Sequence, residues 1–196
     1  MIGSLWFNSF SSGAGASSDY ELISTTVLGA SQATITFTNS GTWTPYKHLQ
    51  IRAVTRNTNA APGSTVNYGA NGVIRFNSDT GTNYRAHYLQ GDGAGATSGD
   101  YGAGITCAYI PDLGGVWDSH TANSFGAFVI DIADWAGAKN KTIRSLGGFM
   151  DGGKRVALAS TAWFSTAAVT TISISEDGGA SGFKTGSRFS LYGLKG

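Results

Sequence analysis

Hydrophobic and polar residues alternate along this chain with a period of two in many short runs. In Thr34–Thr38 (TITFT), Ile35 and Phe37 fall on one face. In Leu49–Thr55 (LQIRAVT), the apolar positions again fall on every second residue, with Gln50 and Arg52 on the opposite face. Strict alternation over four to eight residues is typical of a half-buried β-strand. The pattern therefore predicts β-strands in both segments.

Similar runs follow one another through the rest of the chain, each bounded by Gly, Asn, Asp or Ser. They are Tyr20–Leu28, Val73–Phe76, Tyr84–Gln90, Ile105–Ile110, Phe125–Asp131, Thr142–Phe149, Arg155–Thr161, Thr170–Ser175 and Arg188–Leu194. Only Asp131–Lys139 (DIADWAGAK) indicates a turn or two of helix. Many short strands with turn signals between them predict an all-β fold: an antiparallel β-sandwich of the jelly-roll type, with two sheets packed face to face.

Two Gly-rich stretches interrupt the strand pattern. Gly91–Gly104 (GDGAGATSGDYGAG) predicts a long mobile loop. Gly148–Lys154 (GFMDGGK) has the G-x-x-x-x-G-K spacing of a phosphate-binding loop, but Arg155 stands where Ser or Thr must hold the metal. We therefore expect no nucleotide binding there, and interpret the segment as a hairpin turn between Leu146 and Val156, with Asp151-Gly152 as its turn pair.

Residues 1–18 differ from the rest of the chain. An apolar cluster of Leu5, Trp6, Phe7 and Phe10 precedes a Gly/Ala/Ser tract that has the composition of a flexible linker. Such a cluster, if free in water, would expose enough apolar surface to mark an interaction site. We expect residues 1–18 to be an anchoring arm that docks on a neighbouring subunit or on the shell of a larger assembly, and residues 19–196 to be one domain. The alternative is that the arm folds back and completes the core of its own domain.

Composition narrows the class of protein further. Charged residues make up 13% of the 196 residues and the formal net charge is +1, so there is no electrostatic footprint for nucleic acid. A surface with so little charge favours a protein that neighbouring subunits cover. The single cysteine, Cys107, excludes an internal disulfide framework and is expected to be a small buried hydrophobe. Neither a signal peptide nor a membrane span is evident, so we expect synthesis in a cytoplasm and no membrane partner.

Candidate chemistry is sparse, and we predict no catalytic, metal or cofactor-binding residues. Asn77, Asp79 and Asn83 alternate in NSDTGTN and carry oxygens suited to a cation, but an Asx-rich connection between strands is the stronger interpretation. The three histidines, His48, His87 and His120, are not at metal-ligand spacing, and there is only one cysteine to join them.

Paired carboxylates and exposed tryptophans would suggest a carbohydrate-active protein. Asp131 and Asp134 are three residues apart, but nothing else in the sequence predicts a cleft around them, and a pair of acids at a helix start is the simpler interpretation. In a β-sandwich of this size, most tryptophans should lie in the core or in an interface; they include Trp43, Trp117, Trp135 and Trp163.

Five stretches together resemble a widespread group of tailed-phage structural domains that end in a near-identical RFSLYG-x-KG tail. They are YELISTTVLG (20–29), YKHLQIRAVTRNT (46–58), IRFNSDTGTNYRAHYLQGDG (74–93), FVIDIADWAGAKNKTIRSLGG (128–148) and RFSLYGLKG (188–196). The resemblance covers roughly residues 20–196. Members of this group occur as the C-terminal part of tail or fibre proteins and as stand-alone capsid decoration or cement proteins. The resemblance supplies no catalytic motif whose residues could be assigned in this chain.

The resemblance implies a virion structural protein, assembled in the host cytoplasm. The leading hypothesis is a capsid decoration or cement protein that binds the major capsid protein lattice as a homotrimer and stabilises the head. The alternative is a tail fibre, spike or baseplate domain that binds host surface glycans. A glycan-degrading enzyme is a weaker third hypothesis, because the sequence offers neither a cleft nor an acid pair.

Overall fold

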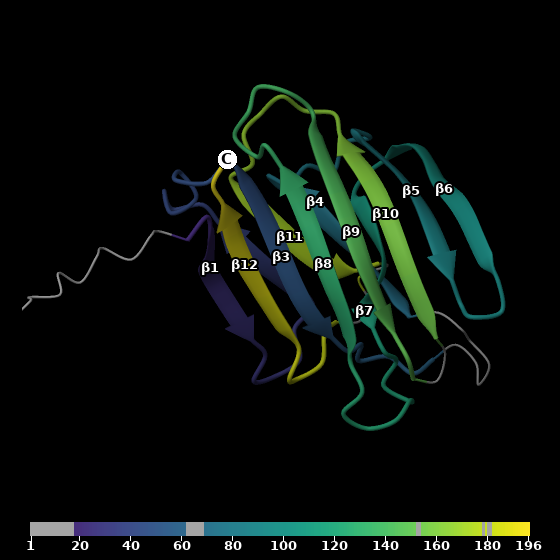
Figure 1. Cartoon of the computed structure of the whole chain (residues 1–196). Coiled ribbons are helices and arrows are strands. Elements are labelled where there is room, and N and C mark those ends of the chain that lie inside the picture. Colours follow the sequence, from purple (N-terminus) through teal and green to yellow (C-terminus); the bar gives the residue numbers. More distant parts are fainter. Residues whose placement is uncertain (1–17, 62–68, 152–153, 178, 180–181) are drawn as a thin grey trace, which may run out of the picture.

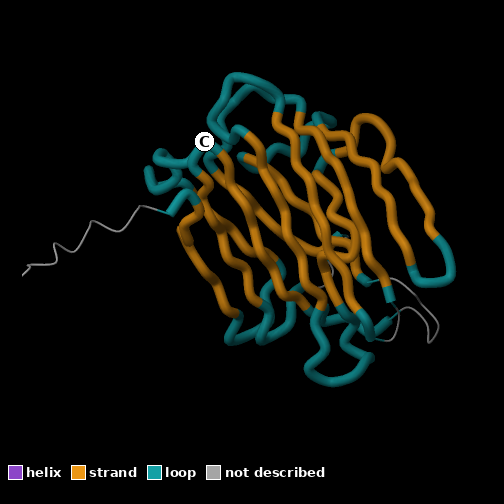
Figure 2. Tube along the Cα trace, in the orientation of Figure 1, coloured by secondary structure: helices purple, strands orange, loops and turns teal. Residues whose placement is uncertain are grey.

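The computed structural model describes residues 18–61, 69–151, 154–177, 179 and 182–196. Within these residues, twelve antiparallel strands form two sheets, one of eight strands and one of four. In Figure 1 the eight-stranded sheet faces the viewer and the four-stranded sheet lies behind it. Figure 2 shows strands joined by loops at both ends of the sandwich, with no helix drawn among the described residues. The predicted all-β sandwich with two antiparallel sheets is confirmed.

The strands follow a simple order across each sheet. The large sheet runs β1 (Tyr20–Val27), β12 (Arg188–Leu194), β3 (His48–Thr55), β8 (Gly126–Ala133), β9 (Lys141–Phe149), β10 (Arg155–Trp163), β5 (Tyr84–Gly91) and β6 (Ala96–Ile105). The small sheet runs β2 (Thr34–Thr38), β11 (Thr171–Glu176), β4 (Ala70–Phe76) and β7 (Ala108–Gly115).

The core lies between the two sheets. Ile51, Ile130 and Ile143 point inward from neighbouring strands of the large sheet and are fully buried, as are Phe76 and Ile174 of the small sheet. The expected burial of the tryptophans is confirmed, because Trp43, Trp117, Trp135 and Trp163 are all at most 8% exposed. Cys107 is buried as expected, at 3% exposure.

The strand order favours a jelly roll, although that topology stays a prediction. The chain alternates between the two sheets from β1 to β5, and again from β6 to β8 and from β10 to β12. The hairpins β5–β6 and β9–β10 both add to the same edge of the large sheet. Without these hairpins, two four-stranded sheets remain, β1-β12-β3-β8 and β2-β11-β4-β7, which is the size of a double Greek-key sandwich.

Two expectations about local structure are wrong. Gly91–Gly104 is not a long loop: it contains the end of β5, a tight turn and nine of the residues of β6, which pairs with β5 along its length. The segment after β8 is not helical either. Asp134 adopts a left-handed φ of 53°, and Asp134–Lys139 forms consecutive turns in which Lys139 pairs with Asp134. Asp and Gly fit such turns as readily as a helix start.

The hairpin expected around Gly148–Lys154 is present as β9–β10, but its register differs from the predicted one. Phe149 pairs with Arg155, so residues 150–154 connect the strands instead of a two-residue turn, and Leu146 faces Leu158. Residues 152 and 153 of this connection lie outside the described residues.

Candidate functional site

The outer face of the large sheet is the most distinctive surface of the protein. Within the described residues no second layer covers this face, which points toward the viewer in Figure 1. Side chains alternate between the two faces of a strand, so strand register places outer-face residues in rows across the sheet. Two of these rows are apolar, one over β8, β9, β10 and β5 and the other over β3, β8, β9 and β10.

The first row places Val129, Leu146, Leu158 and Leu89 side by side on successive strands. The second row runs from Val54 through Ala127 and Gly148 to Val156. We call the larger side chains of these rows the apolar band; its members are Val54, Val129, Leu146, Val156, Leu158 and Leu89.

The apolar band is unusually exposed for side chains of this kind. Leu89, Leu146, Val156 and Leu158 are 50–56% exposed, and Val54 is 42% exposed. The band crosses four strand spacings and two rows, which corresponds to an area on the order of 300 Å². The largest apolar patch on a typical monomer is ~300–600 Å² and is often functional. The band is therefore a candidate interaction surface.

A shallow hollow of about 470 Å³ lies within the band. Val54 and Val156 form two of its sides and Leu146 a third, while Ala127 and Gly148 contribute little or no side chain between them. Beside it, a smaller hollow of about 230 Å³ is lined by Leu89 and Leu158 on the same face. Apart from Arg52 at one rim, the main hollow is lined by apolar side chains and backbone.

A polar row borders the band on the same face. The phenol of Tyr20 donates to Oε1 of Gln50 at 2.7 Å, and Nε2 of Gln50 donates to Asp131 at 2.8 Å. Arg144 completes the row with an ion pair to Asp131 at 3.5 Å. Burial raises the pKa of Tyr20 above its usual range.

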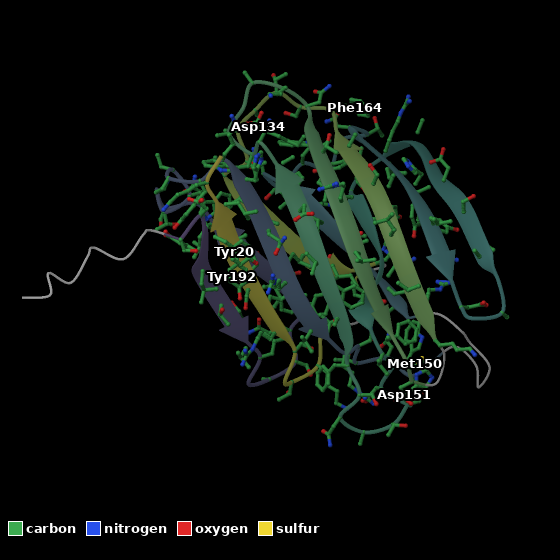
Figure 3. The ribbon with its side chains drawn as sticks, in the orientation of Figure 1. Tyr20, Asp134, Met150, Asp151, Phe164 and Tyr192 are labelled. Atoms are coloured by element: carbon green, nitrogen blue, oxygen red, sulfur yellow. The ribbon has the colours of Figure 1, made fainter. Side chains whose placement is uncertain are left out.

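Two aromatic rings extend this row to the edge of the sheet. Tyr20 and Tyr192 lie side by side in Figure 3, with ring centroids 4.7 Å apart and nearly parallel planes. The guanidinium of Arg52 lies 5.2 Å from the ring centroid of Tyr20 and 5.5 Å from that of Tyr192. The polar row and the two rings thus form one connected cluster across five strands, from β1 to β9.

In the Asx-rich segment between β4 and β5, side-chain oxygens accept hydrogen bonds from neighbouring protein groups. This is expected of a connection between strands. Asp79 accepts hydrogen bonds from the indole of Trp163, the side chain of Asn83 and the backbone of Gly81. Asn77, with a left-handed φ of 52°, accepts from the backbone of Thr170 and Thr171.

The remaining candidates for chemistry form no common site, although the backbone N–H of Asp134 donates to Nδ1 of His48 at 2.9 Å. His48 and His87 lie on β3 and β5, which β8, β9 and β10 separate, and His120 lies in the connection before β8. Asp131 is on the outer face, whereas Asp134 lies in the following turn and pairs with Lys139. Among the described residues, no group of three or more His, Cys, Asp or Glu side chains could hold a metal ion.

Sequence reasoning placed the interaction site elsewhere. The predicted arm residues Leu5, Trp6, Phe7 and Phe10 lie outside the described residues, so their role stays a prediction. The apolar band was not predicted from the sequence. Its signal lies in RVALAS (155–160), where large and small apolar residues alternate. The larger residues Val156 and Leu158 are exposed, whereas Ala157 and Ala159 are buried.

Comparisons with protein-family models, with curated proteins and with solved structures find no match to this chain. No helix in the described part of the chain has the length and hydrophobicity needed to cross a membrane.

Proposed function

We propose that this protein is a virion structural protein of a tailed phage, and specifically a capsid decoration protein. It would occupy the outer surface of the major capsid protein lattice in many copies, assembling in the host cytoplasm. The observation that carries the proposal is the exposed apolar band on a sheet face, in a chain with 13% charged residues. A surface of this kind is suited to an assembly in which neighbours cover it.

The free energy available from burying one band favours many weak contacts in an assembly over a single tight contact. Full burial of a Val or Leu side chain contributes about 1.5–3 kcal/mol, so covering half-exposed side chains contributes about half of that each. Association in turn costs an estimated 4–15 kcal/mol in lost freedom of motion. One band therefore supports only weak binding by itself, and an assembly in which many copies each make such a contact raises the overall affinity of a copy for the assembly.

A homotrimer is the assembly we propose for the decoration protein. It follows from the resemblance to phage decoration proteins, which cap local three-fold points of a capsid lattice. A net charge of +1 supports it further, because subunits with little charge repel one another weakly.

A tail fibre or spike that binds host glycans is the second candidate. The observation that favours it is the aromatic and polar cluster of Tyr20, Tyr192, Arg52, Gln50 and Asp131, residue types that bind sugars. The rings stack on each other, however, and the polar groups are hydrogen-bonded within the cluster. A sugar would have to displace these contacts, so the decoration protein is the better-supported proposal.

Copy number in the particle tests the proposal. We would purify virions of the phage that encodes this chain and measure its abundance relative to the major capsid protein by quantitative mass spectrometry. Hundreds of copies per particle are expected for a decoration protein. A few copies would support the fibre or spike instead, and absence from the particle would contradict both.

A further inference from the structure

The apolar band has no cover within the described residues, yet the chain carries an apolar segment that matches it in chemistry. The 17 residues before the described part contain Leu5, Trp6, Phe7 and Phe10, and no Asp, Glu, Lys or Arg. The hollow of about 470 Å³ is lined mainly by apolar groups. Its volume is within the ~300–1,000 Å³ range of pockets that bury small apolar ligands, which is sufficient for an aromatic side chain.

The distance from β1 to the hollow bears on whether the hollow binds the N-terminal segment of its own chain or that of a neighbouring copy. The N-terminal segment joins the sheet at Tyr20, which is in register with Leu194 and His48. The hollow lies about four strand spacings away, near β9, and about six residues further along the strands, beside Val54. Strand geometry makes this a diagonal of about 28 Å.

The linking tract is short for that distance. Phe7 precedes Tyr20 by 13 residues, which span about 43–47 Å when fully extended. A Gly/Ser-rich chain of this length has a root-mean-square span of only about 18–22 Å. To reach its own hollow the tract must be stretched beyond this span and must cross the polar row at Gln50 and Asp131. A hollow on an adjacent copy can lie closer to Tyr20.

We propose that the hollow beside Leu146 binds the apolar segment around Trp6 and Phe7 of a neighbouring copy of this chain. Each copy then contributes one segment and one hollow, so that the contact links copies head to tail and closes into a ring when the rotation between them allows it. This inference goes beyond the proposed function, because it concerns contacts between copies and does not require a capsid.

Disulfide trapping between two full-length variants tests the proposal. Phe7→Cys carrying an affinity tag is mixed with untagged Leu146→Cys under a mild oxidant; native Cys107 is buried and stays unreactive. We expect a covalent dimer of one tagged and one untagged chain. The matched control is Leu22→Cys, which lies on β1 of the same sheet with 56% exposure against 53% for Leu146, and which we expect not to crosslink.

The double variant Phe7→Cys/Leu146→Cys separates contact within a chain from contact between chains. A disulfide that forms only within single chains of the double variant would overturn the proposal. So would the absence of any crosslink, or equal crosslinking of Leu22→Cys.

Tryptophan fluorescence gives a second measurement without a crosslink. The other four tryptophans are at most 8% exposed, so subtracting the spectrum of Trp6→Phe from that of the native chain isolates Trp6. We expect emission at the short wavelengths of a buried indole, and loss of that shift in Leu146→Asp. Emission typical of a water-exposed indole in the native chain would overturn the proposal. Neither experiment uses virions, so its failure is distinct from failure of the proposed function.

Discussion

Asp112 is the most deeply buried acidic residue among those described. It is fully buried on β7, with a left-handed φ of 57°, and its Oδ1 accepts from the backbone of Gly69 at 2.8 Å and from Arg155 at 3.3 Å. Its Oδ2 has no hydrogen-bond partner. Burial raises the pKa of Asp112 to about 6, against a smaller opposing effect of Arg155.

This raised pKa predicts a stability that falls as the pH rises. The folded protein holds the Asp112 proton up to about pH 6, whereas the unfolded chain releases it near pH 4, so folding is weakened across that window. At ~1.4 kcal/mol per pKa unit, the loss from this group by pH 7 is about 3 kcal/mol. As the pH rises from 4 to 7, we expect the free energy of unfolding of Asp112→Asn to increase relative to that of the native protein by up to about 3 kcal/mol.

Urea denaturation of both proteins at pH 4, 5, 6 and 7 measures this difference. Other carboxylates with lowered pKa values, such as Asp79 and Asp118, are common to both proteins and cancel in the comparison. Parallel stability curves for the two proteins would show that Asp112 does not titrate in this range.

Arg56 organises the connection that precedes β8. Its side chain is nearly buried, and it donates to the backbone carbonyls of Asp118, His120, Thr121 and Ser124 at 2.7–3.0 Å. One guanidinium therefore satisfies four carbonyls of a segment that lacks regular structure.

Replacing Arg56 should destabilise the protein strongly. Arg56→Met leaves these carbonyls and the Asp118 carboxylate without their buried partner, for which we expect a loss of about 3–5 kcal/mol in the free energy of unfolding. The matched control is Arg188→Met, which removes an exposed arginine from β12 and should change stability by less than about 0.5 kcal/mol. Denaturation of both variants in urea provides the comparison, and equal losses would contradict this role for Arg56.

At the scale of elements, β12 shows how the C-terminal RFSLYGLKG sequence fits the fold. The strand lies between β1 and β3, so it is an inner strand of the large sheet. Gly193 is required there because the ring of Tyr46 occupies the space of its side chain: a Cβ at Gly193 would lie 2.1 Å from that ring. Tyr46 in turn donates to Glu21 on β1 at 2.8 Å, so Gly193 allows a contact that ties the edge strand to the sandwich.

Gly193→Ala should therefore displace Tyr46 and lower stability by about 1–3 kcal/mol, which is typical of overpacking. Gly29→Ala is the control, since a Cβ at Gly29 has no neighbour within 4 Å, and it should change stability by less than about 0.5 kcal/mol. Thermal unfolding followed by circular dichroism measures both. A neutral Gly193→Ala would mean that Tyr46 moves aside without loss.

Strands with large alternating side chains could be predicted from the sequence, and strands without them could not. The bounds of β2 and β12 are those predicted, because Ile35 and Phe37, like Phe189 and Leu191, mark one face clearly. By contrast, β6 is made largely of Gly, Ala, Ser and Thr, which carry no hydrophobic period; it forms a strand because it pairs with β5.

The candidate site shows a different limit of sequence reasoning. In β10 both faces are apolar, so alternation alone does not indicate which face enters the core. Register with β9 places the small residues Ala157 and Ala159 inside, beside Gly147 and Ser145, and turns Val156 and Leu158 outward. This selection depends on the packing of the two sheets, which no local pattern encodes.

At the scale of the whole molecule, the described residues already form a closed sandwich. Its core cluster draws on both sheets and includes Leu28, close to the end of β1. Ser18 belongs to this domain as well, because its hydroxyl bonds to the backbone of Tyr20 and its carbonyl accepts from Lys195. We therefore expect this core to be complete without the residues before Ser18.

Deletion of residues 1–17 should therefore separate folding from assembly. The shortened protein is expected to keep its β-rich circular dichroism and a melting temperature within about 2 °C of the native value, because a change below ~0.5 kcal/mol shifts the melting of a domain this size by no more than that. At the same time it should sediment as a monomer, whereas we expect the native protein to sediment as a trimer. The shortened protein should also no longer decorate particles, because single copies bind too weakly without their neighbours. Leu146→Asp in the full-length chain should have the same effect on assembly, since it removes the site that receives the segment. If the shortened protein unfolds, the segment completes its own domain's core; if it still assembles and decorates particles, the segment is not the link between copies.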